Sequence, residues 1–447
     1  MAAALAAVVL ATDLSALAAA EPLHGQPPAP DQTSYAHTDI GNSALSPDEQ
    51  VRIAQARLED HPHGDALNHL GEDGKHPVIT DARSPRLQDN AQVNAYTPVT
   101  WEECRAHTYD NKDHAYWYRD KFNFCRIQTL GVNYHEIRDG TIVEVGNTAV
   151  TLGIKATAVD GQNTVNFDVV LTDFKDEGTT YKEWPLSFQL PCVNADPART
   201  STCTEPGGSV VYRKPIGQWE AEAGTEYRFT KTMATTAVPA GTYQAEMRGF
   251  FSANVYMVLE SPILGPETSS TLSVLMRCDS ATYAGGSKCV APDATSVMRF
   301  SATDPTLSES AQFIRDAQTD ITLTKPGVAG KRVPGVLGSG TALHRLYSAY
   351  DFKKDIKASR RRVPKTCRLY YGPKYTVGPN GQARQCDEYP FATTYENSAR
   401  VNNSTVFDYA VRAISKEHNE TAGRLYGAWL GYDHILDGDP FYVEIVP

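Results

Sequence analysis

Alternation of apolar and polar residues dominates the middle of the chain. Between residues 96 and 325, β-branched runs are broken by Gly, Asn and Asp, as in TIVEVGNTAVTLGIKATAV, NTVNFDVVLTDF and ANVYMVLES. A period of two is typical of strands with one buried face, and no helix-scale periodicity competes with it here. The pattern predicts an all-β, sandwich-like domain over residues 96–325.

The pattern changes after a turn-rich segment at residues 326–340, PGVAGKRVPGVLGSG, whose Pro and Gly content predicts a linker. In the segment that follows, 341–447, HNETAGRLYGAWL indicates a polar turn entering a short helix. LDGDP then predicts a turn and FYVEIV a closing strand. We therefore expect a multidomain protein with a small C-terminal α+β domain over residues 341–447.

The N-terminal residues have a different composition. Residues 1–20 are small and apolar, interrupted only by Asp13, and end in three alanines, which predicts a signal peptide although a basic n-region is missing. An Ala-rich helix is the alternative. Residues 21–95 are rich in Pro, Asp, His and Gln, with one short helical pattern from Ser46, and are interpreted as a linker or pro-region. No later segment is apolar enough to predict a membrane span.

Composition and cysteine spacing indicate a folded, exported protein. With 41% hydrophobic and 21% charged residues, the 447-residue chain is too apolar for wholesale disorder. Its eight cysteines fall into four couples without a CxxC motif, which favours local disulfides over zinc ligands and an oxidising, extracellular compartment. The expected couples are Cys104 with Cys125, Cys192 with Cys203, Cys278 with Cys289, and Cys367 with Cys386.

One block of basic residues stands out in an otherwise acidic chain. Residues 341–385 hold eleven cations and two anions, a local balance of plus nine, whereas the whole chain has a formal net charge of −11. Such a block is a candidate for binding a polyanion through phosphate contacts. A solvated basic face or a protease-sensitive dibasic linker is an equally open interpretation.

Three carboxylates are the candidate catalytic or metal-binding residues. Asp387 and Glu388 lie between Cys386 and the rigid Tyr389–Pro390 step, and Glu396 follows. Adjacent residues of a strand face opposite ways, so Asp387 and Glu388 are not expected to share one role.

The runs CDEYPFATTYEN, HNETAG and LDGDPFYVEI, with the earlier LHRL, resemble the NucA/NucB deoxyribonucleases. The resemblance covers residues 341–447 and nothing upstream. It departs from the secreted members at Gln385 and Cys386, where those have an acid shortly before the Asp-Glu pair, and at Tyr389, where they have Trp. It implies DNA as the substrate of a non-specific endonuclease.

The family is similar in part to ββα-metal nucleases, and this similarity implies roles for individual residues. Asp387 would be the general base and Asn419 the helix-borne ligand of Mg²⁺ or Mn²⁺, with Glu388 and Glu396 as further ligands or as groups that fix a water or an arginine. Asn419 is alternatively a plain helix cap. The residues that would bind DNA phosphates are Arg360, Arg361, Arg362 and Arg424.

The resulting hypothesis is a secreted, metal-dependent deoxyribonuclease joined to a β domain of unknown ligand. The alternative is a secreted binding or surface protein, or a toxin, whose β domain recognises a partner while the nuclease-like module is inactive. Because Asn419-Glu420-Thr421 is a glycosylation sequon that would obstruct the metal site, the enzyme hypothesis favours a bacterial host.

Overall fold

The computed structural model describes twelve stretches of the chain: residues 9–12, 78–79, 97–108, 116–138, 141–194, 201–235, 248–261, 265–270, 274–328, 330–347, 353–399 and 409–447. Apart from Val9–Thr12, the expected signal peptide lies outside these residues, as does the helical pattern from Ser46. Within the described residues, no helix combines the length and apolarity needed to cross a membrane.

The N-terminal part, residues 97–290, is mostly β-sheet, as the alternating pattern predicts, and is called the β region below. Its largest sheet has the order β1-β4-β5-β6-β11-β9, with β3 paired to β4. The strands are β1 (Val9–Thr12), β3 (Trp117–Tyr118), β4 (Asn123–Arg138), β5 (Thr141–Ala158), β6 (Thr164–Gly178), β9 (Ser201–Thr204) and β11 (Glu226–Thr235).

Two four-stranded sheets, β10-β7-β13-β14 and β16-β15-β12-β8, complete the β region. Their strands are β7 (Pro185–Gln189), β8 (Cys192–Asn194), β10 (Tyr212–Pro215), β12 (Gly249–Ala253), β13 (Tyr256–Ser261), β14 (Gly265–Ser270), β15 (Val274–Asp279) and β16 (Lys288–Val290). One hydrophobic core joins all three sheets, with Phe124 and Phe167 from the large sheet and Phe188 and Phe251 from the small ones.

Helices also occur where the sequence pattern predicted strands alone, so that expectation was incomplete. They are α4 (Trp101–Thr108), α5 (Ile216–Ala221), α6 (Ser308–Thr319) and the 3-10 turns η2 (Thr282–Ala284) and η3 (Ile321–Leu323). The shorter ones are below the length at which periodicity separates a helix from a strand. In α6, however, Ala311, Ile314 and Ala317 are buried at helical spacing.

The four predicted disulfides are confirmed. The pairs Cys104–Cys125, Cys192–Cys203, Cys278–Cys289 and Cys367–Cys386 all form. Each links residues 11 to 21 positions apart, so each closes a short loop and constrains the unfolded chain locally.

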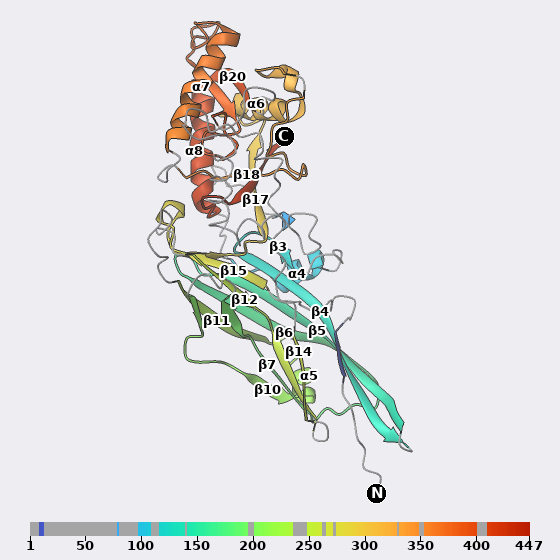
Figure 1. Cartoon of the computed structure of the whole chain (residues 1–447). Coiled ribbons are helices and arrows are strands. Elements are labelled where there is room, and N and C mark those ends of the chain that lie inside the picture. Colours follow the sequence, from blue (N-terminus) through green and yellow to red (C-terminus); the bar gives the residue numbers. More distant parts are fainter. Residues whose placement is uncertain are drawn as a thin grey trace.

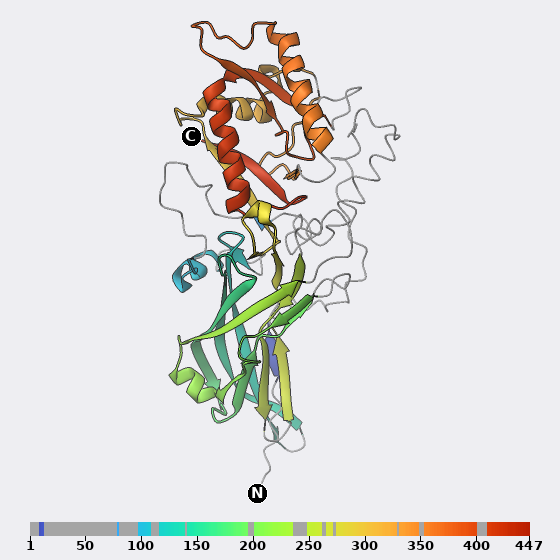
Figure 2. The ribbon, with the colours of Figure 1, turned by 90° about the vertical axis from the view of Figure 1, so that its left-hand side faces the viewer.

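Residues 294–447 form a C-terminal unit with a core of its own (Figures 1 and 2). Its main sheet has the order β18-β21-β17-β2, and a separate hairpin pairs β19 with β20. The elements are β17 (Ala294–Ser301), β18 (Leu343–His344), α7 (Lys353–Tyr371), β19 (Arg384–Tyr389), β20 (Ala410–Ser415), α8 (Lys416–Tyr432) and β21 (Pro440–Val446). Strand β2 (Val78–Ile79) comes from outside these residues and pairs in parallel with the start of β17.

The core of this unit begins earlier in the chain than the boundary expected at residues 326–340. Strand β17 pairs in parallel with β21, from Ser296 opposite Phe441 to Ser301 opposite Val446. Phe313 and Ile314 of α6 join Trp429 of α8 in the same core. The difference has a physical cause: strand pairing over such a sequence distance leaves no local signal in either strand.

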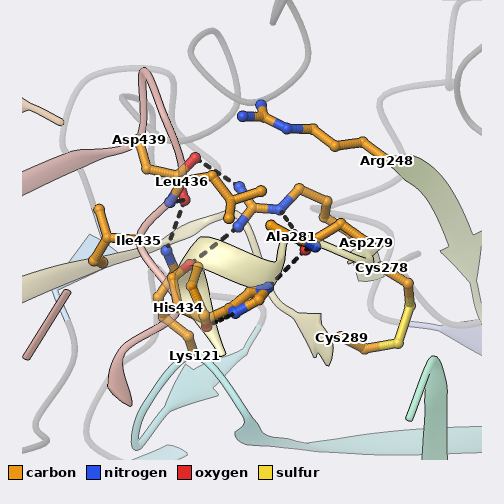
Figure 3. Close-up of polar contacts among 12 residues, drawn as sticks. Lys121, Arg248, Cys278, Asp279, Ala281, Cys289, His434, Ile435, Leu436 and Asp439 are labelled. Carbon is orange, nitrogen blue, oxygen red and sulfur yellow. Dashed lines mark hydrogen bonds and ion pairs between the residues drawn. A yellow bond between two sulfur atoms is a disulfide. The ribbon is translucent and has the colours of Figure 1, made fainter. Parts of the chain in front are cut away.

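A buried polar cluster connects the β region to the C-terminal unit (Figure 3). The Asp439 carboxylate accepts hydrogen bonds from Arg277 Nη1 at 2.6 Å and Lys121 Nζ at 3.4 Å. His434 bonds through Nε2 to Asp279 at 2.8 Å and through Nδ1 to the Ala284 carbonyl at 2.7 Å. Burial alone would raise the pKa of Asp439, but the cations around it hold that pKa well below its usual value.

Candidate active site

The hairpin β19–β20 and the helix α8 that directly follows it carry the residues singled out from the sequence. The two strands pair antiparallel from Arg384 opposite Ser415 to Tyr389 opposite Ala410. Helix α8 buries one stripe at helical spacing, formed by Thr421, Ala422, Leu425, Tyr426, Trp429 and Leu430. This stripe and α6 pack on one face of the hairpin, and α7 packs on the other (Figure 2).

Asp387 projects toward α6. Its Oδ2 accepts a hydrogen bond from Ser310 Oγ at 2.5 Å, and its Oδ1 accepts one from the Glu388 amide at 2.8 Å. The side chain keeps some contact with solvent, whereas Ser310 is fully buried. Burial raises the pKa of Asp387 to about 6, and the two hydrogen bonds oppose this rise.

Asn419 lies on the same face of the hairpin as Asp387. Its Nδ2 donates to Gln385 Oε1 at 3.0 Å, and Gln385 precedes Asp387 by two residues on the strand. Residues two apart on a strand share a face. The alternative of Asn419 as a helix cap is wrong, because Ser415 occupies the N-cap position and Asn419 is inside α8.

Glu388 points the opposite way, toward α7, as the strand periodicity predicts. Its Oε2 accepts from Ser359 Oγ at 2.7 Å and from Ser398 Oγ at 3.3 Å. The adjacent disulfide Cys367–Cys386 ties this face of the strand to α7. Burial raises the pKa of Glu388 to about 7, and the Asp387 charge adds to the rise.

Glu396 is occupied by a different partner. Its two carboxylate oxygens bond to His344, at 3.0 Å to the backbone amide and at 2.8 Å to Nδ1, and both residues are buried. This pair fixes β18 to the segment that connects β19 to β20. Within the described residues, the hydrogen bonds of Glu396 do not connect it to Asp387 or Asn419.

The four arginines expected at DNA phosphates are divided between two places. Arg360 and Arg361 are exposed on α7, and Arg362 donates to the Ser398 carbonyl, so all three belong to the Glu388 side. Arg424 is exposed on α8, with Nη2 2.8 Å from Thr421 Oγ1. Arg412, which the sequence analysis did not select, lies opposite Asp387 in the ladder and pairs with Asp316 at 2.8 Å.

The hairpin, α7 and α8 all lie inside one matched segment. Residues 340–444 match the family model Deoxyribonuclease NucA/NucB. The resemblance inferred from the sequence motifs is therefore confirmed, and a NucA/NucB domain implies DNA as the substrate. The match starts after β17 and α6. No curated protein and no solved structure matches the chain.

Two residues that bond to Asp387 or Asn419 were missed by sequence reasoning. Ser310 lies 77 residues before Asp387 and outside the matched segment, so no motif connects the two. Gln385 was noted only as a departure from an acidic family position, yet it joins the strand to α8 through Asn419 and, at 3.0 Å, through Glu420. The strand period of two was the available signal for Gln385, because it places this residue on the Asp387 face.

Proposed function

We propose that the NucA/NucB domain is a divalent-metal-dependent endonuclease that hydrolyses the DNA backbone with little sequence preference. One observation carries this proposal: within the matched segment, Asp387 and Asn419 lie on one face of a strand–strand–helix arrangement, joined through Gln385. The partial similarity to ββα-metal nucleases is part of the proposal, because the order of hairpin and helix fits that arrangement.

Asp387 is the proposed general base. A base must accept a proton from water near neutral pH, and a carboxylate with a pKa of about 6 is better matched to this task than one with an ordinary value. Ser310 donates to one oxygen and the Glu388 amide to the other, so the carboxylate plane is fixed by two hydrogen bonds. Each oxygen keeps one further lone pair with which to accept a proton from the attacking water.

Asn419 is the proposed metal-binding residue. The groups on this face are a carboxylate and two side-chain amides, an oxygen donor set that suits Mg²⁺ or Mn²⁺. No cluster of three His, Cys, Asp or Glu that could hold a metal ion occurs in the described part of the chain, so the proposed metal site rests on the oxygen donors of this face. When bound, the ion would polarise the phosphate and stabilise the leaving oxygen.

The remaining candidates have more limited proposed roles. Arg424, which is exposed on α8 and close to Asn419 in sequence, is proposed to contact a DNA phosphate. Glu396 is proposed to fix β18 through His344, and Glu388 to fix the hairpin on α7. The four disulfides support secretion into an oxidising compartment.

The test is nicking of supercoiled plasmid by the oxidised full-length protein with Mg²⁺, Mn²⁺ or EDTA. Asp387→Ala and Asn419→Ala are compared with matched controls at exposed sites, Asp160→Ala and Asn380→Ala. We expect metal-dependent nicking that both site variants abolish and both controls retain. Folded wild-type protein that fails to nick plasmid with both Mg²⁺ and Mn²⁺ would overturn the proposal and favour the alternative, a binding or surface protein with an inactive module.

A further inference from the structure

The outer surface of α7 carries a row of exposed cations, of which Arg360 is near enough to the Glu388 carboxylate to oppose the rise of its pKa. Six of its lysines and arginines are exposed, and none of them forms an ion pair within the described residues: Lys354, Lys357, Arg360, Arg361, Lys365 and Arg368. These six are called the α7 stripe. Asp355, the acid in the first turn of α7, is buried and thus does not offset the charge at the surface.

The spacing of the α7 stripe works against helix stability. Lys357, Arg361 and Lys365 follow one another at intervals of four residues, which places like charges on adjacent turns of one face. Such pairs destabilise a helix, and alternating signs would relieve the repulsion. Here the fold tolerates the repulsion because Val363 and Cys367 anchor the opposite side of α7 in a buried cluster.

The α7 stripe is separated from Asp387 by the hairpin. Helix α7 contacts the face of β19 that bears Cys386 and Glu388, through the Cys367–Cys386 disulfide and the Ser359 hydrogen bond. Asp387 faces α6 on the other side. The exposed cations of α7 are therefore not arranged around the phosphate that Asp387 would act on.

We propose that the α7 stripe is an exosite for duplex DNA, which binds the backbone at phosphates distant from the hydrolysed bond. The identity of the ligand rests on the proposed function. From Lys354 to Arg368 the stripe is about 21 Å long at 1.5 Å per residue, and one DNA strand presents a phosphate about every 3.4 Å along the duplex axis, so the stripe spans roughly six phosphates. Exposed cations bind such a polyanion by releasing its counterions, without reading its sequence.

The C-terminal end of α7 also has features of a lipid-binding surface, and the experiment must distinguish lipid binding from DNA binding. Leu369 is 76% and Tyr370 44% exposed beside Arg368. Cations next to exposed apolar side chains also suit an anionic lipid surface. We propose DNA as the ligand because the exposed cations extend along most of the helix, whereas its exposed large apolar residues are confined to the last turn.

The test measures DNA binding without cleavage, using full-length Asp387→Asn protein in EDTA. Anisotropy of a labelled duplex longer than α7 is recorded between about 50 and 200 mM salt. The variant Lys357→Gln/Arg361→Gln/Arg368→Gln is compared with Arg105→Gln/Lys175→Gln/Arg213→Gln, which removes the same formal charge from the β region. Of these three control residues, Arg105 is half-buried and pairs with Asp173, and Arg213 pairs with Glu260. Both proteins are first shown to keep the parental melting temperature.

We expect the α7 variant to bind at least about tenfold more weakly at low salt, with a salt slope smaller by about 0.9 for each lost contact, while the β-region variant binds like the parent. Equal binding by the two variants would overturn the exosite. So would loss of binding to anionic phosphatidylserine vesicles with unchanged DNA binding, which would assign the stripe to lipid.

The outcome is independent of the nuclease test. A wild-type protein that fails to nick plasmid, but binds DNA through α7, would refute the proposed function and leave the exosite standing. Metal-dependent nicking by the wild type, with DNA binding by the α7 variant equal to that of the parent, would support the proposed function and refute the exosite.

Discussion

The two faces of the β19–β20 hairpin surround consecutive carboxylates in different ways. On one face, Asp387 accepts a hydrogen bond from Ser310 and shares its surroundings with the amides of Gln385 and Asn419. On the other, Glu388 is bound by two serines beside a disulfide. Burial raises both pKa values, so the comparison teaches that a shifted pKa alone does not identify the reactive group.

The comparison is tested most strongly by neutralising each carboxylate in turn. Asp387→Asn should lower kcat/KM for DNA cleavage by about 10²- to 10⁴-fold, the range typical of a lost general base. Glu388→Gln keeps hydrogen-bonding groups toward Ser359 and Ser398 and should cost less than about tenfold. Cleavage of a labelled duplex at saturating Mg²⁺ measures both, and a larger loss for Glu388→Gln would reverse the assignment.

The same Glu388→Gln substitution should stabilise the protein at alkaline pH. Because the folded-state pKa is raised from 4.5 to about 7, the ionised form is disfavoured on folding, and stability is lost as pH rises through about 7. At pH 8 the variant should gain about 1–3 kcal/mol, after allowance for the partial exposure of the side chain. Near about pH 3.5 the gain should vanish, because the wild-type group is then mostly protonated in both the folded and the unfolded state.

Chemical denaturation at the two pH values measures this gain. Glu183→Gln, at an exposed turn of the β region, is the matched control and should leave the free energy of unfolding unchanged at both. A gain for Glu388→Gln that did not depend on pH would argue against an ionised buried carboxylate.

The activity of the wild-type enzyme should depend on the ionisation of Asp387. A base with a pKa of about 6 is mostly protonated at pH 5, so kcat/KM should fall about tenfold between neutral pH and pH 5. The measurement is kcat/KM against pH at a fixed concentration of free metal ion. A flat profile over this range would contradict Asp387 as the base.

Ser310→Ala should have the smallest effect of the series. Loss of one hydrogen bond to the Asp387 carboxylate, with the Glu388 amide still bound, should lower kcat/KM about threefold to tenfold. Because the Ser310 hydrogen bond lowers the pKa of Asp387, its loss should also move the acidic limb of the pH profile of kcat/KM to higher pH. Ser310→Thr retains the hydroxyl and should restore both. In an Asp387→Asn background Ser310→Ala should have no further effect, and an undiminished effect there would make Ser310 merely structural.

Local features of this molecule could be predicted from its sequence. The alternating pattern predicted the strands of the β region, neighbour spacing predicted the four disulfides, and the strand period separated Asp387 from Glu388. The long-range features could not be predicted. The partners of Ser310 and Glu396 depend on how distant elements pack, and no pattern within α6 or β18 records them. The family was identified from the resemblance of the C-terminal motifs to NucA/NucB deoxyribonucleases. The periodicity of apolar residues alone would not have identified it.

The parallel pairing of β17 with β21 has a practical consequence for any gene fragment of this protein. A fragment starting at residue 341 would lack the strand that occupies one edge of β21 and the helix that covers Trp429. Unpaired strand edges and uncovered apolar surface promote aggregation between copies. A fragment intended for soluble expression should therefore begin before Ala294, inside the segment that leaves the last strand of the β region.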